Sequence, residues 1–230
     1  WNVVPVRTVN LSASGAALSI APLDRIEEPL SLTDLHRVID ARLPQLDLPE
    51  LILEMHARTG FAAAFTHASE GNARAEDIAT TICAVLVAEA TNTGFEPLVR
   101  PEVSALRRSR LSWVKQNFIR AETLTTANAL LVAAHNRIPL ARVWGSGEVA
   151  SADGLRFTVP VRTIHAGPNP RYFGRERGIT WYNLVSDRFS GLNALTVPGT
   201  LRDSLYLLAV ALDQETALRP GETMTDTAGY

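Results

Sequence analysis

Ser151-Ala152-Asp153-Gly154 and Met224-Thr225-Asp226-Thr227 bound the stretch of sequence that decides the fold. Between them, residues 155–163 alternate apolar and polar side chains, which predicts a half-buried strand. Residues 179–185 and 193–197 are rich in β-branched and aromatic side chains and are separated by turn-forming residues, so they predict two further strands. The aspartates of the two bounding motifs are expected at the ends of strands.

A helix is predicted after Pro198-Gly199, with Thr200 as its N-cap. Its apolar residues recur at spacings of three and four, which indicates one face that lies on the sheet. They are Leu201, Leu205, Leu208, Ala209 and Leu212. Because a helix between strands usually joins a parallel pair, the short strand ending at Asp226 is expected to pair with the strand at Asp153. Both carboxylates would then lie at one sheet edge, where open α/β sheets bind ligands.

The predicted order strand, strand, strand, helix, strand is the order in which the ribonuclease-H-like fold of nucleases and transposases begins. Upstream, apolar periodicity and capping residues predict helices over residues 33–43, 49–58, 75–93, 107–120 and 122–138. Thr33 is the expected N-cap of the first of these helices, and Gly60 is the expected C-terminal stop of the second. The predicted fold class is α/β, with a mostly helical N-terminal part followed by the first half of a ribonuclease-H-like mixed sheet, truncated. Two carboxylates at its edge offer only oxygen ligands, which suits Mg²⁺ because this hard cation needs few protein ligands.

Four motifs, in this order along the chain, resemble the DDE domain of Tn3-family transposases. They are residues 149–154 (VASADG), 167–174 (GPNPRYFG), 198–204 (PGTLRDS) and 225–230 (TDTAGY). The resemblance continues upstream in residues 54–60, 65–71 and 108–123, and it covers about residues 49–230.

The resemblance implies a DNA transposase that cleaves the 3′ ends of a transposon and joins them to target DNA in replicative transposition. It implies that Asp153 and Asp226 are the first two acids of the catalytic triad and ligands of Mg²⁺ or Mn²⁺, with two ions in the complete site. The implied partners are DNA, as terminal inverted repeats and target, and a second protomer in a homodimer of the full-length protein. The implied location is the bacterial cytoplasm, at the nucleoid when DNA is bound.

Three regions are expected along the chain. Residues 1–32 would be a linker or the remnant of an upstream domain, residues 33–145 a helical region, and residues 146–230 the N-terminal half of a ribonuclease-H-like DDE catalytic domain. In the Tn3 family the third acid is a glutamate well downstream, whereas Asp226 is followed here by four residues. The 230 residues are therefore expected to be a piece of a longer protein and to be inactive alone.

Two alternatives stay open. The first is a ribonuclease-H-like nuclease that hydrolyses DNA without strand transfer, which would bind Mg²⁺ in the same way. The second is a scaffold or dimerisation module in which the two acids have no catalytic role. Replacement of either aspartate would leave transposition intact only in the second case.

Composition narrows the class of protein. With 46% apolar and 20% charged residues, the chain has the composition of a soluble globular protein. The longest apolar runs, such as residues 205–212, fall short of the roughly 18 residues that a membrane span needs, so no membrane partner is expected. The single Cys83 excludes a disulfide within the chain and a cysteine-based zinc site. We interpret Cys83 as a buried small hydrophobic residue rather than a reactive thiol.

The net charge of −2 is unevenly distributed along the chain. Residues 1–99 hold 6 basic and 13 acidic side chains (−7), residues 100–190 hold 14 and 6 (+8), and residues 191–230 hold 2 and 5 (−3). A basic segment flanked by acidic ones is typical of a nucleic-acid groove beside a carboxylate metal site. A solvated surface would give the same distribution.

Eight basic residues are predicted to contact DNA. They are Arg107, Arg108, Arg110, Lys115 and Arg120 in a predicted helix, and Arg171, Arg175 and Arg177 in a loop between strands. The helix would follow the phosphate backbone with its basic face, whereas the loop alternates arginine with Tyr172 and Phe173, a mixture suited to phosphate contacts and stacking. The alternatives are a solvated helix face and a hairpin tip anchored in the core by the two aromatic rings.

Overall fold

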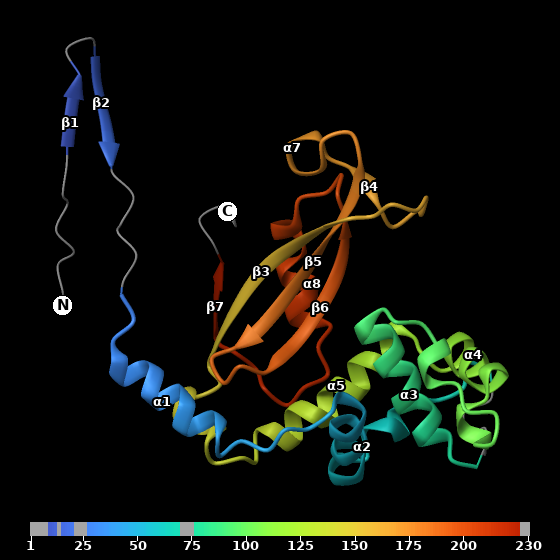
Figure 1. The fold of residues 1–230 in the computed structure, drawn as a ribbon. Helices are drawn as coiled ribbons and strands as arrows, with labels where there is room; N and C mark the ends of the chain where they lie inside the picture. Colours follow the sequence, from blue (N-terminus) through green and yellow to red (C-terminus); the bar gives the residue numbers. More distant parts are fainter. Residues whose placement is uncertain (1–8, 13–14, 21–26, 70–75, 226–230) are drawn as a thin grey trace. The chain divides into compact units, whose positions relative to one another are not determined.

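The computed structural model describes residues 9–12, 15–20, 27–69 and 76–225 (Figure 1). Asp226, and with it most of the last sequence motif, lies outside these described residues. The chain forms two compact units, residues 1–46 and 47–230. The region boundaries that we expected after residues 32 and 145 stay predictions.

The first unit contains a β-hairpin and a helix. Strands β1 (Val9–Ser12) and β2 (Gly15–Ile20) pair antiparallel, with Val9 opposite Ile20. Helix α1 (Leu30–Asp40) begins earlier than predicted, because Pro29 is already the residue that precedes the first turn. The Leu32 N–H donates to the Pro29 carbonyl at 2.9 Å. Thr33 is therefore inside the first turn and is not the N-cap.

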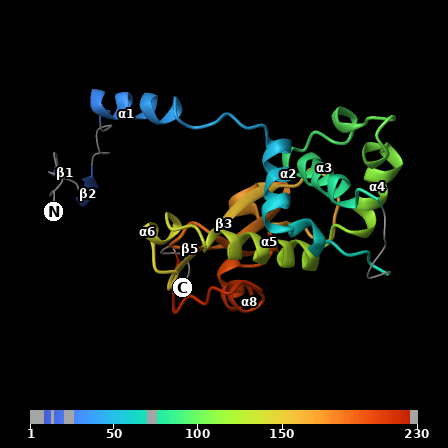
Figure 2. The same ribbon diagram turned by 90° about the horizontal axis from the view of Figure 1, so that it is seen from below.

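The second unit begins with a group of helices. They are α2 (Leu48–Thr59), η1 (Phe61–Ala64), α3 (Ile78–Thr91), η2 (Glu96–Leu98), η3 (Ser104–Leu106), α4 (Arg108–Asn117), α5 (Ala121–His135) and α6 (Ala141–Trp144). Gly60 ends α2 as predicted, with φ of +70° and its N–H donating to the His56 carbonyl. Helix α5 contacts η1 of this group and β6 of the sheet, so it joins the two halves of the unit (Figure 2). In the part of the chain that the structure describes, no helix is long and apolar enough to cross a membrane.

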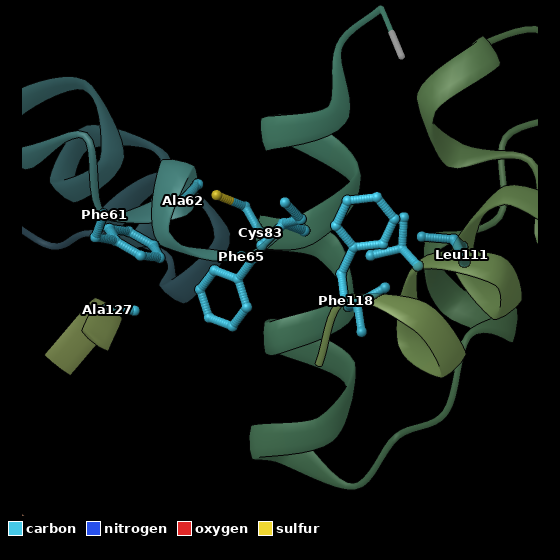
Figure 3. Close-up of a cluster of buried hydrophobic side chains, with 10 residues drawn as sticks. Phe61, Ala62, Phe65, Cys83, Leu111, Phe118 and Ala127 are labelled. Atoms are coloured by element: carbon cyan, nitrogen blue, oxygen red, sulfur yellow. The ribbon is translucent and has the colours of Figure 1, made fainter. Parts of the chain in front are cut away.

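An apolar cluster holds the helices together, with Phe61, Phe65, Leu111 and Phe118 around α3 (Figure 3). Cys83 lies within it and is 3% exposed. Burial raises the pKa of the Cys83 thiol to about 11, since the charged thiolate is poorly solvated there. The interpretation of Cys83 as a buried hydrophobic residue is confirmed.

A mixed sheet forms the second half of the unit. Its strands are β3 (Val149–Thr158), β4 (Gly167–Pro168), β5 (Arg177–Ser186), β6 (Gly191–Pro198) and β7 (Glu222–Thr225). Strand β5 pairs antiparallel with β3, β4 and β6, and β3 pairs with β7 on its other side. The β3–β7 pair is parallel, with Val149 opposite Glu222 and Ala152 opposite Thr225 (Figure 1). The predicted parallel pairing of the last strand is confirmed.

Strand β3 corrects two expectations. Asp153 lies in the middle of β3 rather than at a strand end, because the ladder with β5 runs without a break from Ala150 to Thr158. The strand also ends at Thr158, two residues before Pro160, which has no N–H to donate. Its buried residues are Ala150 and Ala152, whereas Leu155 is 62% exposed.

The crossover between β6 and β7 consists of η4 (Asp203–Tyr206) and α8 (Leu207–Leu212). The predicted face is wrong: Leu205, Leu208 and Leu212 are 73–77% exposed, and Val210 is fully buried instead. Residues 203–206 form a 3₁₀ turn with three residues per turn, so the apolar spacing does not continue along one α-helical face. Thr200 lies in a turn and caps no helix.

Candidate metal and nucleic-acid site

Asp153 lies on the sheet face that α8 does not cover. Its neighbours in β3, Ala152 and Gly154, have side-chain positions on the opposite face, since strand residues alternate. Ala152 belongs to the buried cluster that contains Val210 of α8. Asp153 itself is exposed, and its Oδ1 accepts the Gly154 N–H at 2.7 Å. One carboxylate oxygen is therefore held by the backbone, and the side chain faces solvent.

The parallel pairing brings the two aspartate motifs to one place in the sheet. It ends, within the described residues, at Ala152 opposite Thr225. Asp153 and Asp226 are the next residues in the sequence, and Asp226 lies outside the described part. Among the described residues no group of three or more His, Cys, Asp or Glu side chains is placed to hold a metal ion.

The donors present at Asp153 fit a hard cation. Asn183 is the cross-strand partner of Asp153 on β5, so a carboxylate and an amide lie side by side on this face. Both groups offer oxygen, the ligand that Mg²⁺ and Mn²⁺ favour. Protein-bound Mg²⁺ commonly takes one or two carboxylates, and Asp153 could supply one of them.

A groove of about 710 Å³ runs between α5 and this face of the sheet. Trp181, Asn183 and Thr196 line it from the sheet, and Leu124 and Asn128 line it from α5. Asn183, which lines the groove, is also the cross-strand partner of Asp153, so the acid lies one strand away from a groove residue.

The same face continues as exposed apolar surface beyond Asp153. Leu155 pairs with Trp181 across the two strands, and the two side chains are 62% and 44% exposed. Phe157, two residues further along β3, is 46% exposed. The face therefore combines an acid with aromatic and aliphatic surface.

The predicted basic helix is shorter than expected, and its cations contact neighbouring protein groups. Helix α4 spans Arg108–Asn117, so Arg107 and Arg120 lie outside it. Arg108 pairs with Glu96, and Lys115 Nζ lies 2.7 Å from Glu89 Oε1. Within α4 the exposed cations Arg108 and Lys115 are therefore both paired with glutamates, and the basic face that we expected along residues 107–120 stays a prediction.

Backbone carbonyls bind the remaining cations of this group. Arg110 donates to the carbonyl of Glu76, and Arg107 donates to that of Pro101 at 3.2 Å. Arg120 donates to the Thr66 carbonyl at 2.9 Å and precedes α5 in extended conformation. These contacts give the arginines a structural role, and their role in DNA binding stays a prediction.

The second basic group lies around helix α7 (Pro170–Phe173). Arg171, Arg175 and Arg177 are exposed. Phe173 is buried, and it packs where Gly199 leaves room: an added Cβ there would lie 2.6 Å from the Phe173 ring. Tyr172 is 45% exposed, so only one of the two rings anchors this segment.

Three polar residues escaped the sequence analysis, namely Arg156, Arg202 and Asp203. They line a second cavity together with Arg171 and Tyr172. Two of them lie in the motif PGTLRDS, and Arg156 follows the first aspartate motif in β3. Arg156 is far from Arg202 and Asp203 in the sequence, so local patterns do not predict that these residues lie together.

Comparison with known proteins places these features in a family. Residues 50–230 match the family model of the Tn3 transposase DDE domain. The chain belongs to this family. It is 56% identical over 213 residues to the transposase for transposon gamma-delta of Escherichia coli (strain K12), which covers 93% of this chain and 21% of that protein.

Two further Tn3-family relatives show the same partial coverage. The transposase for transposon Tn4556 of Streptomyces fradiae is 46% identical over 213 residues, 93% of this chain and 24% of its own length. The transposase for transposon Tn1546 of Enterococcus faecium is 31% identical over 220 residues, 96% and 22% of the respective lengths. The chain thus spans 21–24% of the length of these relatives. The resemblance to the Tn3-family DDE domain is confirmed.

Proposed function

We propose that this region performs metal-dependent phosphoryl transfer on DNA, within a transposase that cleaves transposon 3′ ends and joins them to target DNA in replicative transposition. The parallel pairing of β3 with β7, which reaches Ala152 and Thr225, carries the proposal. The last paired residues, Ala152 and Thr225, are each followed in the sequence by the aspartate of their motif, Asp153 or Asp226. Membership of the Tn3 transposase DDE family supports it.

In this proposal Asp153 and Asp226 are ligands of Mg²⁺ or Mn²⁺, and a glutamate outside these residues is the third acid. Asp153 suits the role because the ladder with β5 fixes its backbone and the Gly154 N–H holds its Oδ1 at 2.7 Å. A ligand held in this way loses little further freedom on binding. Two bound ions would supply an activated water or 3′-hydroxyl and stabilise the leaving oxygen.

The DNA would be held by groups on the sheet and around α7. Arg171, Arg175 and Arg177 are exposed and supply positive charge, which attracts the phosphate backbone. Trp181, at the groove beside α5, offers a ring on which a base can stack. We propose terminal inverted repeats and target DNA as the ligands, and a homodimer of the full-length protein as the unit that processes two transposon ends.

The test uses the gamma-delta relative as host. Residues 1–230 replace its matching fifth, and transposition frequency is measured in cells. Asp153→Asn and Asp226→Asn are expected to lower the frequency by about 10³-fold or more, as removal of catalytic groups does. The control is Asp213→Asn, an exposed carboxylate after α8, which is expected to leave the frequency unchanged.

Full transposition by an Asp153→Asn chimera would contradict the proposal and favour a scaffold. In vitro, labelled transposon ends separate the other alternative, because a nuclease would release 3′ ends without joining them to target DNA. Joined products that need both aspartates and Mg²⁺ are the expected result.

A further inference from the structure

A cavity of about 400 Å³ lies on the sheet face opposite to Asp153. Arg156 lines it from β3, three residues beyond Asp153, and an odd spacing along a strand places two side chains on opposite faces. The surroundings of Gly154 independently support this placement of the cavity. An added Cβ at this glycine would lie 2.6 Å from Oδ2 of Asp203, another residue that lines the cavity.

The cavity is positively charged. Arg156, Arg171 and Arg202 line it against one carboxylate, Asp203, so these four side chains carry a net charge of +2. Arg156 Nη2 lies 3.3 Å from Asp203 Oδ2, and the two side chains are 37% and 19% exposed. Asp203 offsets Arg156, and the exposed Arg171 supplies positive charge that an anionic ligand would meet.

Tyr172 organises two of these arginines. The guanidinium carbon of Arg156 lies 3.9 Å from the centre of its ring, and that of Arg171 lies 5.3 Å from it. Both distances are within the range of a cation–π interaction. Guanidinium groups held in place lose less freedom when they bind, and their planar fork matches the oxygens of a phosphate.

The acid and the arginines lie near each other along β3. Asp153 and Arg156 are three positions apart, roughly 10 Å along the strand, and their side chains lie on opposite faces of the sheet. The two groups are therefore near enough for one DNA molecule to contact both.

We propose that the cavity lined by Arg156, Arg171 and Arg202 is a phosphate subsite, which holds a backbone phosphodiester of DNA on the sheet face opposite to Asp153. The inference rests on the proposed function, because it takes DNA as the ligand. The cavity would bind the DNA at a phosphate other than the reacting one, so that groups on both faces of β3 contact the DNA.

The test measures binding of the 230-residue chain to a fluorescent DNA duplex by anisotropy, in EDTA, so that the result does not depend on metal chemistry at Asp153. Arg171→Ala is expected to weaken binding about tenfold and to lower the salt slope by about one. Arg171→Lys keeps the positive charge but loses the planar guanidinium group, so its DNA affinity is expected to lie between those of the wild type and Arg171→Ala. The matched control is Arg142→Ala, an exposed arginine of α6, which is expected to bind like the wild type.

A second measurement identifies the phosphate. Each duplex carries one neutral methylphosphonate linkage at a different position, and its affinity for the protein is measured. At one position the linkage is expected to weaken DNA binding by the wild type but not by Arg171→Ala. Wild-type affinity of Arg171→Ala, with circular dichroism that shows normal folding, would overturn the proposal. So would equal losses for all linkages in both proteins. Displacement of DNA by inorganic phosphate or a mononucleotide at DNA-like concentrations would overturn it in favour of a small phosphate ligand.

Discussion

Two arginine-rich regions of this domain differ in how they use their charge. In the α4 region, residues 107–120, the cations bind groups of their own protein, such as Glu96 for Arg108 and the Thr66 carbonyl for Arg120. On the sheet face opposite to Asp153, Arg156, Arg171 and Arg202 line one cavity, and Arg156 pairs with Asp203 there. Charge density along the chain is higher in the first region. The cavity nevertheless presents more positive charge to an anionic ligand than the α4 region does.

The difference has a geometric cause. Helix α4 packs its apolar residues Leu111 and Val114 into the helical core, so its cations lie beside other helices and loops that offer carboxylates and carbonyls. The cavity is assembled from β3, α7 and the turn before η4, where glycines let the segments approach closely. A cluster of basic residues in a sequence therefore indicates a ligand only when the fold directs cations such as the exposed Arg171 to a cavity.

The largest expected effect tests whether α4 is held in the fold mainly by its buried apolar side chains. Leu111 is fully buried in the cluster that includes Phe118. Leu111→Ala is expected to lower the free energy of unfolding by about 2–5 kcal/mol, through lost burial and the cavity left behind. Urea denaturation measures it, with exposed Gln116→Ala of the same helix as the control within about 0.5 kcal/mol. A loss below about 1 kcal/mol would show that α4 is not held by its core face.

The next effect concerns the wall of the cavity. An added Cβ at Gly154 would lie 2.6 Å from both Asp203 Oδ2 and Thr180 Cγ2. Gly154→Ala is expected to lower the free energy of unfolding by about 1–3 kcal/mol through overpacking and, since it displaces the partner of Arg156, to weaken DNA binding. Thermal unfolding and anisotropy measure the two effects.

The control for this substitution is Gly191→Ala, because an added Cβ at Gly191 meets no described atom within 4 Å. It is expected to change neither stability nor DNA binding appreciably. Equal behaviour of the two variants would mean that the close approach of Asp203 to β3 has no energetic importance.

Much of the sheet could be predicted from local patterns. Alternation and β-branched residues indicated β5 and β6, and the crossover rule indicated that β7 would run parallel to β3. These features follow from short segments and from the handedness and length of connections. The same local logic found the end of α2 at Gly60.

The other features depend on a turn geometry or on contacts between distant segments, which the pattern of a single segment does not predict. The 3₁₀ turn at 203–206 rotates the apolar face of α8, so the buried residue is Val210 and not Leu208. The arginine cavity joins residues 156, 171 and 202, which lie on separate segments. Asp153 was predicted as a candidate from its motif, but its position in mid-strand follows from the register with β5. Its partner Asp226 lies outside the described residues.

The smallest expected effect tests the first region directly. Lys115 Nζ lies 2.7 Å from Glu89 Oε1, with side chains 50% and 43% exposed. Solvent screens such a pair, so Lys115→Ala is expected to change the free energy of unfolding by less than about 1 kcal/mol, and a double-mutant cycle with Glu89→Ala to give a coupling that shrinks as salt rises. DNA affinity is expected to fall less than in Arg171→Ala, because Glu89 already neutralises the ammonium. If Lys115→Ala weakens DNA binding more than Arg171→Ala does, α4 is the main DNA surface and the contrast between the two regions is reversed.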